Sequence, residues 1–98
     1  MTIIEDNMLR SPFHPGYFLR KLLAEHGLSQ TRLSRHIGVQ IAVVNQICKE
    51  KRGISPAMAL KLAGALRTSP EFWLNLQTAF DLSRAPLKTS IKPLIRVG

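Results

Sequence analysis

The chain has 98 residues but contains only one cysteine, one tryptophan and one tyrosine. A single cysteine, Cys48, cannot form an internal disulfide, which excludes a disulfide-stapled secreted scaffold and favours a reducing compartment. No apolar run approaches the roughly 20 residues of a transmembrane helix, and the early pair Ile3-Ile4 is followed directly by Glu5 and Asp6. These absences predict one soluble, cytoplasmic domain with a single modest core.

Acidic residues are also scarce. Six Asp and Glu stand against fourteen Lys and Arg, which gives a net charge of +8. The excess lies in residues 28–54 and 84–98, whereas residues 1–27 and 55–83 each sum to zero. A localised basic block on a small domain indicates a polyanionic partner, with nucleic acid ahead of an anionic membrane. A solvated basic face with no partner is the alternative that charge alone leaves open.

The sequence offers no set of residues typical of an enzyme or a metal site. The histidines, His14, His26 and His36, are far apart, so they and the one cysteine do not match the short ligand spacings of zinc sites. The carboxylates are scattered over different segments and form no acid–base pair. The helical pattern turns Cys48 inward, where a thiol is a core residue rather than a nucleophile. We therefore expect no enzyme activity, cofactor or metal, and we expect His14 to be a helix cap or a surface residue.

Proline and glycine divide the chain into five segments of helical length. Prolines follow His14, Ser55 and Ser69, each at a position suited to the first residue of a helix, and the two serines can cap their helices. Three glycines fall where a periodic pattern ends, as in left-handed helix caps: Gly27, Gly38 and Gly53. Apolar spacing then predicts helices at residues 15–27, 30–37, 40–49, 56–66 and 70–82.

Two segments outside these helices lack helical periodicity. Residues 1–12 show no clear pattern, and residues 84–98 combine two prolines with an absence of acids. Because Pro93 forbids a central strand, we expect the second segment to be an edge strand or an extended arm.

Residues 30–47 have the spacing of a helix-turn-helix. Two short helices that cross steeply must approach closely, which the small Ser34 permits. The chain must also reverse tightly between them, and Gly38 can adopt the left-handed backbone that this needs. Apolar residues at the remaining inner positions seal the corner: Leu33, Val39, Val44 and Ile47.

The second helix of this motif has an outward face that is uncharged until its end. At 100° per residue, Val44, Ile47 and Cys48 lie together on the inner side. Outward amides can pair with adenine and methyl groups can touch thymine, and the N-terminal end of such a helix inserts first. We expect base contacts from Gln40, Ile41, Ala42, Val43, Asn45 and Gln46. We expect phosphate contacts from Gln30, Thr31, Arg35, Lys49, Lys51 and Arg52. An ordinary surface helix is the alternative.

The segment at residues 70–82 carries more apolar residues than one core contact requires. An apolar surface left over in this way is typical of an interface. We expect a dimer contact there from Trp73, Leu74 and Phe80. A purely internal role in the core is the alternative.

Five short segments carry a family resemblance, at residues 14–19, 27–30, 51–55, 58–60 and 68–77. Together they resemble the HigA-type antitoxins, a branch of the Cro and phage-repressor helix-turn-helix superfamily, and residues 68–77 are the most distinctive. The resemblance implies an all-α fold, a compact five-helix lambda-repressor-like domain over residues 13–83. An N-terminal arm (1–12) and a basic C-terminal arm (84–98) would flank it.

The same resemblance implies a homodimer that represses its own operon at an inverted repeat. It also implies neutralisation of a co-encoded HigB-like toxin, a messenger-RNA endoribonuclease. Such a toxin must be basic to hold RNA, so apolar contacts must dominate its complex with a chain of net charge +8. We expect the toxin to dock on the N-terminal segment and first helix, away from the recognition helix, through Ile3, Ile4, Glu5, Asp6, Phe13 and Glu25. A stand-alone repressor and a toxin-binding module without DNA contacts are the alternatives.

This chain departs from the family pattern at three points. Glu50 stands where the family commonly has glycine, which places an acid beside the expected phosphate contacts. Ser34 replaces a common alanine, which is a small change. Ile41 and Val43 are more apolar than in many recognition helices, so the base sequence read by relatives does not transfer.

Overall fold

The computed structural model describes residues 12–85 and 91–95 of the chain. Five helices lie in these ranges: α2 (Pro15–Glu25), α3 (Gln30–Ile37), α4 (Ile41–Cys48), α5 (Pro56–Leu66) and α6 (Pro70–Arg84). The described residues contain no strand, which confirms the all-α fold. Each helix begins and ends within two residues of the bounds expected from sequence.

Three helices begin at the serine caps that the sequence predicts, and two of these serines are followed by proline. The hydroxyl oxygens of Ser29, Ser55 and Ser69 accept hydrogen bonds from backbone N–H groups three residues later, at 3.0, 3.2 and 3.0 Å. Each bond satisfies an N–H group that the first helical turn leaves without an intrahelical partner. Pro56 and Pro70 then occupy the first helical positions, where the missing N–H has no cost.

The helix ends follow the glycine pattern only in part. Gly27 and Gly38 have positive φ angles of 61° and 72°, which confirms both as left-handed caps. The expectation for Gly53 is wrong, because the left-handed residue after α4 is Glu50, with φ 62°. Arg67 has the same conformation after α5, with φ 55°. A residue with a side chain is less stable in this left-handed conformation than glycine by roughly 1 to 2 kcal/mol.

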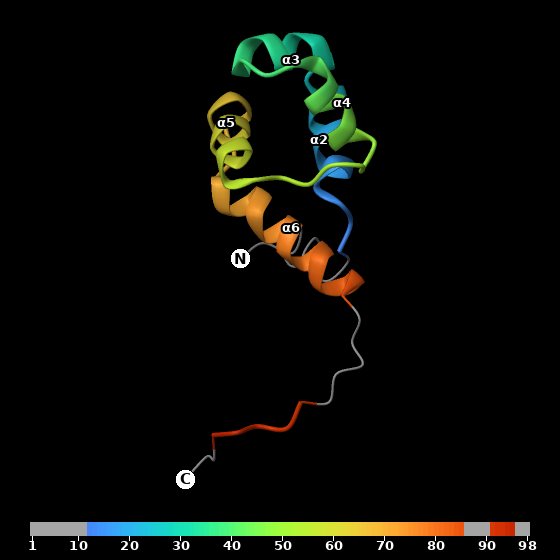
Figure 1. The fold of residues 1–98 in the computed structure, drawn as a ribbon. Coiled ribbons are helices and arrows are strands. Elements are labelled where there is room, and N and C mark those ends of the chain that lie inside the picture. Colours follow the sequence, from blue (N-terminus) through green and yellow to red (C-terminus); the bar gives the residue numbers. More distant parts are fainter. Residues whose placement is uncertain (1–11, 86–90, 96–98) are drawn as a thin grey trace.

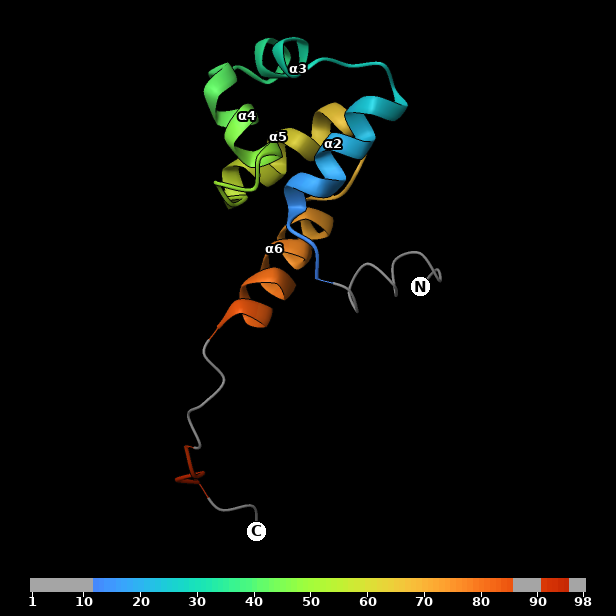
Figure 2. The same ribbon diagram turned by 90° about the vertical axis from the view of Figure 1, so that its right-hand side faces the viewer.

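The helices pack around one core. Figure 1 shows α3 at one end of the molecule, with α2 and α4 on one side and α5 on the other, and Figure 2 shows α6 running out beyond the other helices. Helix α4 contacts α2 and α3, while α6 contacts α2 and α5. Helices α2, α3, α4 and α5 supply much of the core, and the expected inner positions Leu33, Val44, Ile47 and Cys48 are buried there. The other buried residues of these helices include Leu19, Leu23, Ala59 and Leu62.

Trp73 lies at the centre of this core rather than on an interface. Its side chain is 0% exposed, and its indole Nε1 donates to the hydroxyl of Thr68 at 2.7 Å. The expectation that Trp73 forms a dimer contact is therefore wrong, since the monomer leaves none of its surface free. Leu74 and Phe80 on the same helix are half-buried and keep surface that a partner can cover.

No helix in the described ranges is long and apolar enough to cross a membrane. Residues 91–95 are exposed and contain neither helix nor strand, so this part of the C-terminal arm does not form the edge strand considered above. Within the arm, residues 86–90 and 96–98 lie outside the described residues.

Candidate nucleic-acid interface

The corner between α3 and α4 has the geometry expected of a helix-turn-helix. Ser34 is buried, and its hydroxyl donates to the backbone carbonyl of Thr31 at 2.8 Å, so a polar side chain is satisfied at the tight crossing. Gly38 adopts the left-handed conformation, and the N–H of Val39 donates to the carbonyl of Ser34 at 3.0 Å. These contacts fix the direction in which α4 leaves the corner.

The outward side of α4 is mostly open to solvent. Gln40, Ala42 and Gln46 are exposed and Ile41 is 49% exposed, whereas Val43 is half-buried. Gln40 is the residue that caps α4, but its side chain makes no capping hydrogen bond. The N-terminal end of α4 therefore presents neutral side chains that nothing in the described residues covers.

Asn45 is less free than its neighbours. Its side-chain Nδ2 donates to Oε1 of Gln30, the first residue of α3, at 3.1 Å, and both residues are half-buried. This bond ties the two helices of the motif together. Part of the hydrogen-bonding capacity expected to face DNA at Asn45 and Gln30 is thus already used within the protein.

The residues expected to bind phosphate surround this face. Thr31 and Arg35 on α3 and Lys49, Lys51 and Arg52 after α4 are all exposed. One contact among them was not anticipated from sequence: Nε of Arg52 donates to Oε1 of Gln46 at 2.8 Å. No simple periodicity predicts this bond, because it depends on how the chain turns after α4.

That turn is closed by two backbone hydrogen bonds. The N–H of Glu50 donates to the carbonyl of Ile47 at 2.9 Å, and the N–H of Lys51 donates to the carbonyl of Gln46 at 2.8 Å. This is the Schellman pattern, in which the residue before Lys51 must be left-handed. A glycine is the residue best suited to that position, and in this chain Glu50 occupies it.

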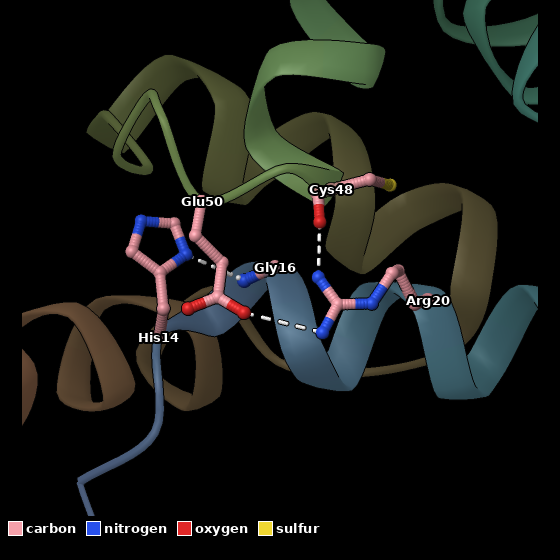
Figure 3. Close-up of polar contacts among 5 residues, drawn as sticks. All are labelled: His14, Gly16, Arg20, Cys48 and Glu50. Carbon is pink, nitrogen blue, oxygen red and sulfur yellow. Dashed lines mark hydrogen bonds and ion pairs between the residues drawn. The ribbon is translucent and has the colours of Figure 1, made fainter.

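Glu50 is held by α2, as Figure 3 shows. Its carboxylate accepts a hydrogen bond from Nη2 of Arg20 at 3.1 Å, and Nη1 of the same guanidinium donates to the backbone carbonyl of Cys48. Arg20 therefore donates to a carbonyl group in the last turn of α4 and also forms an ion pair with Glu50, which follows that turn. The acid beside the phosphate contacts is thus paired within the protein.

The first turn of α2 lies against the last turn of α4. A Cβ on Gly16 would stand 1.9 Å from the carbonyl oxygen of Ile47, so only glycine permits this approach. The positive end of the α2 dipole thereby meets the negative end of α4. The N-terminal end of α2 is therefore not remote from the recognition helix, which corrects that part of the expected toxin docking. The feature of the sequence that indicates this close contact is Gly16, which directly follows the proline that begins α2.

His14 caps α2 from inside the protein. Its Nδ1 accepts a hydrogen bond from the N–H of Gly16 at 2.9 Å, and its ring meets the Phe80 ring edge-on, with centroids 4.9 Å apart. The side chain is buried, so the expected cap is confirmed and the surface position is wrong. Burial lowers the pKa of the imidazole below its usual value, which keeps Nδ1 free to accept.

Cys48 has the environment of a core residue. It is buried, and burial raises the pKa of the thiol above its usual value, so the nucleophilic thiolate is disfavoured. No group of three or more potential metal ligands occurs among the described residues.

The expected toxin contacts are only partly within view. Ile3, Ile4, Glu5 and Asp6 lie outside the described residues. Phe13 is 52% exposed and stacks on Tyr17, with ring centroids 4.9 Å apart. Glu25 is exposed at the last position of α2, at the opposite end of that helix.

Comparisons with known proteins agree with this geometry. The model of a family described as Helix-turn-helix matches residues 19–73. Virulence-associated protein A' of Dichelobacter nodosus is 40% identical over 77 residues, which cover 78% of this chain and 67% of that protein.

Two solved structures are also similar. One is the antitoxin GraA in complex with its operator, with 44% identity, a TM-score of 0.77 and coverage of 87% of this chain and 93% of that one. The other is the antitoxin HigA of Pseudomonas aeruginosa with the higBA promoter, with 38% identity, a TM-score of 0.78 and coverage of 86% and 99%. Relatives of this kind are regulators and antitoxins rather than enzymes. The chain therefore belongs to the helix-turn-helix family, among relatives that include the HigA-type antitoxins.

Proposed function

We propose that this chain is a DNA-binding antitoxin that represses its own operon as a dimer and neutralises a co-encoded HigB-like endoribonuclease. The observation that carries the DNA-binding part is the outward face of α4. It presents neutral amides and methyl groups at its N-terminal end and Lys49, Lys51 and Arg52 at its other end. Neutral groups suit the base edges of the major groove, and cations suit the phosphates at its rim.

Two similar antitoxins whose structures contain operator or promoter DNA support this part of the proposal. A gel-shift titration with the chain's own promoter tests it. We expect tight binding to an inverted repeat whose half-sites lie about one helical turn, roughly 34 to 36 Å, apart. A random duplex of the same length should bind much more weakly. Equal affinity for the two duplexes would contradict operator recognition.

Dimerisation through α6 is the second part of the proposal. Leu74 and Phe80 are half-buried in the monomer, and Leu82 is 66% exposed near the end of the same helix. A charge placed in an apolar interface is costly. Leu74→Glu and Phe80→Glu should therefore shift sedimentation at micromolar concentration from dimer toward monomer. Two folded variants that remain dimeric would place the dimer contact elsewhere.

Toxin neutralisation is the part supported by the antitoxins among the similar proteins rather than by the fold. Phe13 is the exposed apolar anchor nearest the N-terminal segment that carries Ile3, Ile4, Glu5 and Asp6. Deleting residues 1–12 should abolish the rescue of growth from the co-expressed toxin while operator binding persists. Gln46→Ala is the matched control, because it should weaken operator binding and leave rescue intact. Full rescue by the truncated chain would contradict this docking site, and the absence of an adjacent toxin gene would favour a stand-alone repressor.

A further inference from the structure

The contact between Arg52 and Gln46 restricts what the recognition helix can read. Nε of Arg52 donates to Oε1 of Gln46 at 2.8 Å, and both side chains are exposed. A guanidinium has donors and no acceptor, so it must bond the oxygen of the amide and not its nitrogen. The Gln46 oxygen therefore faces Arg52, and the amide NH₂ faces away from it and makes no hydrogen bond to Arg52.

This orientation changes the base that suits Gln46. A free glutamine recognises adenine with both ends of its amide, accepting from N6 and donating to N7. In this structure one of the two lone pairs of the Gln46 oxygen is occupied by Arg52, and the group that points away from the guanidinium is the NH₂ donor. Guanine is the base whose major-groove edge offers two acceptors, N7 and O6, and no donor.

Resting on the proposed operator binding, we propose that Gln46 and Arg52 form one reading unit that selects guanine. Gln46 donates to the guanine edge, and Arg52 is the positioning residue that fixes the amide. The Nη groups of Arg52 remain available for a neighbouring phosphate, since only its Nε is used in the bond to Gln46. Arg52 thus contributes to discrimination between bases as well as to phosphate binding.

The unit is distinguishable from a plain phosphate contact. A residue that only neutralises phosphate changes affinity for every sequence alike and reduces the salt dependence. A positioning residue changes the ratio between a correct and an incorrect base. Lys51 is the matched control for the first behaviour, because it is an exposed cation in the same turn with no side-chain contact to Gln46 among those found in the described residues.

The experiment begins with selection of an operator from a random duplex library by the full-length wild-type chain. Binding constants are then measured by fluorescence anisotropy for each base pair at every operator position, with wild type, Gln46→Ala, Arg52→Ala, the double variant and Lys51→Ala. Circular dichroism melting verifies that each variant is folded. At the position read by Gln46, wild type should prefer guanine by about fivefold or more.

Gln46→Ala and Arg52→Ala should each remove most of this preference, and the double variant should lose no more of it than either single variant. Lys51→Ala should weaken all duplexes and keep the preference. Replacing the guanine with 7-deazaguanine, which lacks the N7 acceptor, should weaken wild type but not Gln46→Ala.

Two results would overturn the reading unit while leaving operator binding in place. One is a preference for guanine that survives Arg52→Ala, and the other is a preference for a different base at the position read by Gln46. Failure to select any sequence would instead contradict the proposed function, and the reading unit with it.

Discussion

The two ends of α4 are built in opposite ways. At the N-terminal end, Gln40 caps the helix without a side-chain hydrogen bond, and the following residues are open to solvent. At the C-terminal end, Arg20 bonds the carbonyl of Cys48 and the carboxylate of Glu50, and the backbone of α2 approaches within contact at Gly16. The free end carries the groups suited to bases, and the anchored end sets the direction of the helix.

The strongest test of the anchored end is Gly16→Ala. The added Cβ would lie 1.9 Å from the carbonyl oxygen of Ile47, so α2 and α4 must separate. We expect a loss of about 3 kcal/mol in the free energy of unfolding, measured by urea denaturation. Gly64→Ala is the control, because nothing lies within 4 Å of the added Cβ in the middle of α5. It should stabilise the fold by about 0.5 to 1 kcal/mol, and equal effects of the two substitutions would contradict close helix contact at Gly16.

Removal of the Arg20 side chain should have the next largest effect. Arg20 makes two hydrogen-bonded contacts and also lies over the Tyr17 ring. Its partly exposed position limits the contribution of these contacts, so Arg20→Ala should lower the free energy of unfolding by about 1 kcal/mol. The turn that carries Lys51 and Arg52 would also lose its support, and operator affinity should fall. Lys21→Ala, on the exposed neighbouring position, should change stability by less than about 0.5 kcal/mol. An operator affinity unaffected by Arg20→Ala would show that the anchored end does not position the turn.

His14, which caps α2 beside the C-terminal end of α4, makes the stability of the protein sensitive to acid. Burial holds its native pKa below the ordinary value of 6.5. Between these two pKa values, His14 is mostly protonated in the unfolded chain and mostly neutral in the native chain. Stability contributed by the neutral ring is complete above pH 6.5 and is lost as the pH falls through the native pKa. The protonated ring also cannot accept from Gly16, and loss of such a cap costs about 1 kcal/mol.

Thermal melting between pH 7.5 and pH 5 measures this dependence. His14→Asn should flatten the curve, because asparagine can cap the helix without titrating in that range. His36→Asn, at an exposed position on α3, should leave the curve as in wild type. A curve for His14→Asn that matches wild type would rule out His14 as the source.

Glu50→Gly is expected to have the smallest effect on stability. Glycine relieves the left-handed strain but removes the ion pair with Arg20, and these contributions of about 1 kcal/mol nearly cancel. Arg67→Gly relieves the same backbone conformation after α5 and serves as the reference, with an expected gain of about 1 kcal/mol. Operator affinity of Glu50→Gly should rise roughly twofold at low salt, because an acid near the phosphate contacts is removed. A gain in stability equal to that of Arg67→Gly would show that the ion pair contributes nothing.

The sequence predicted most of the fold because local signals agreed with one another. Serine caps and apolar spacing predicted where α3, α5 and α6 begin, and prolines added to the signal at α5 and α6. Gly38 predicted the corner of the motif. These features depend on residues close in the chain, which is why a single sequence reveals them.

The predictions from sequence were wrong where contacts between residues distant in the chain determine the structure. Glu50 takes the left-handed position expected of Gly53, in a turn where its carboxylate is paired with Arg20, thirty residues earlier. Gly53 instead lies beside the Gln77 side chain, where an added Cβ would be 2.8 Å from Oε1 and would displace the amide that accepts from the N–H of Ile54. Trp73 resembled an interface residue because helical spacing shows which side of α6 it occupies but not what covers that side.

In the proposed function, α4 reads DNA with its N-terminal end while its C-terminal end is held by α2. Titration of the ¹⁵N-labelled full-length chain with its operator, followed by amide chemical shifts in NMR spectra, measures which end of α4 meets the DNA. We expect the largest shifts at residues 40–46, smaller and salt-dependent shifts at residues 49–52, and little change at residues 56–66 of α5. Large shifts on α5 with none at residues 40–46 would contradict this expectation.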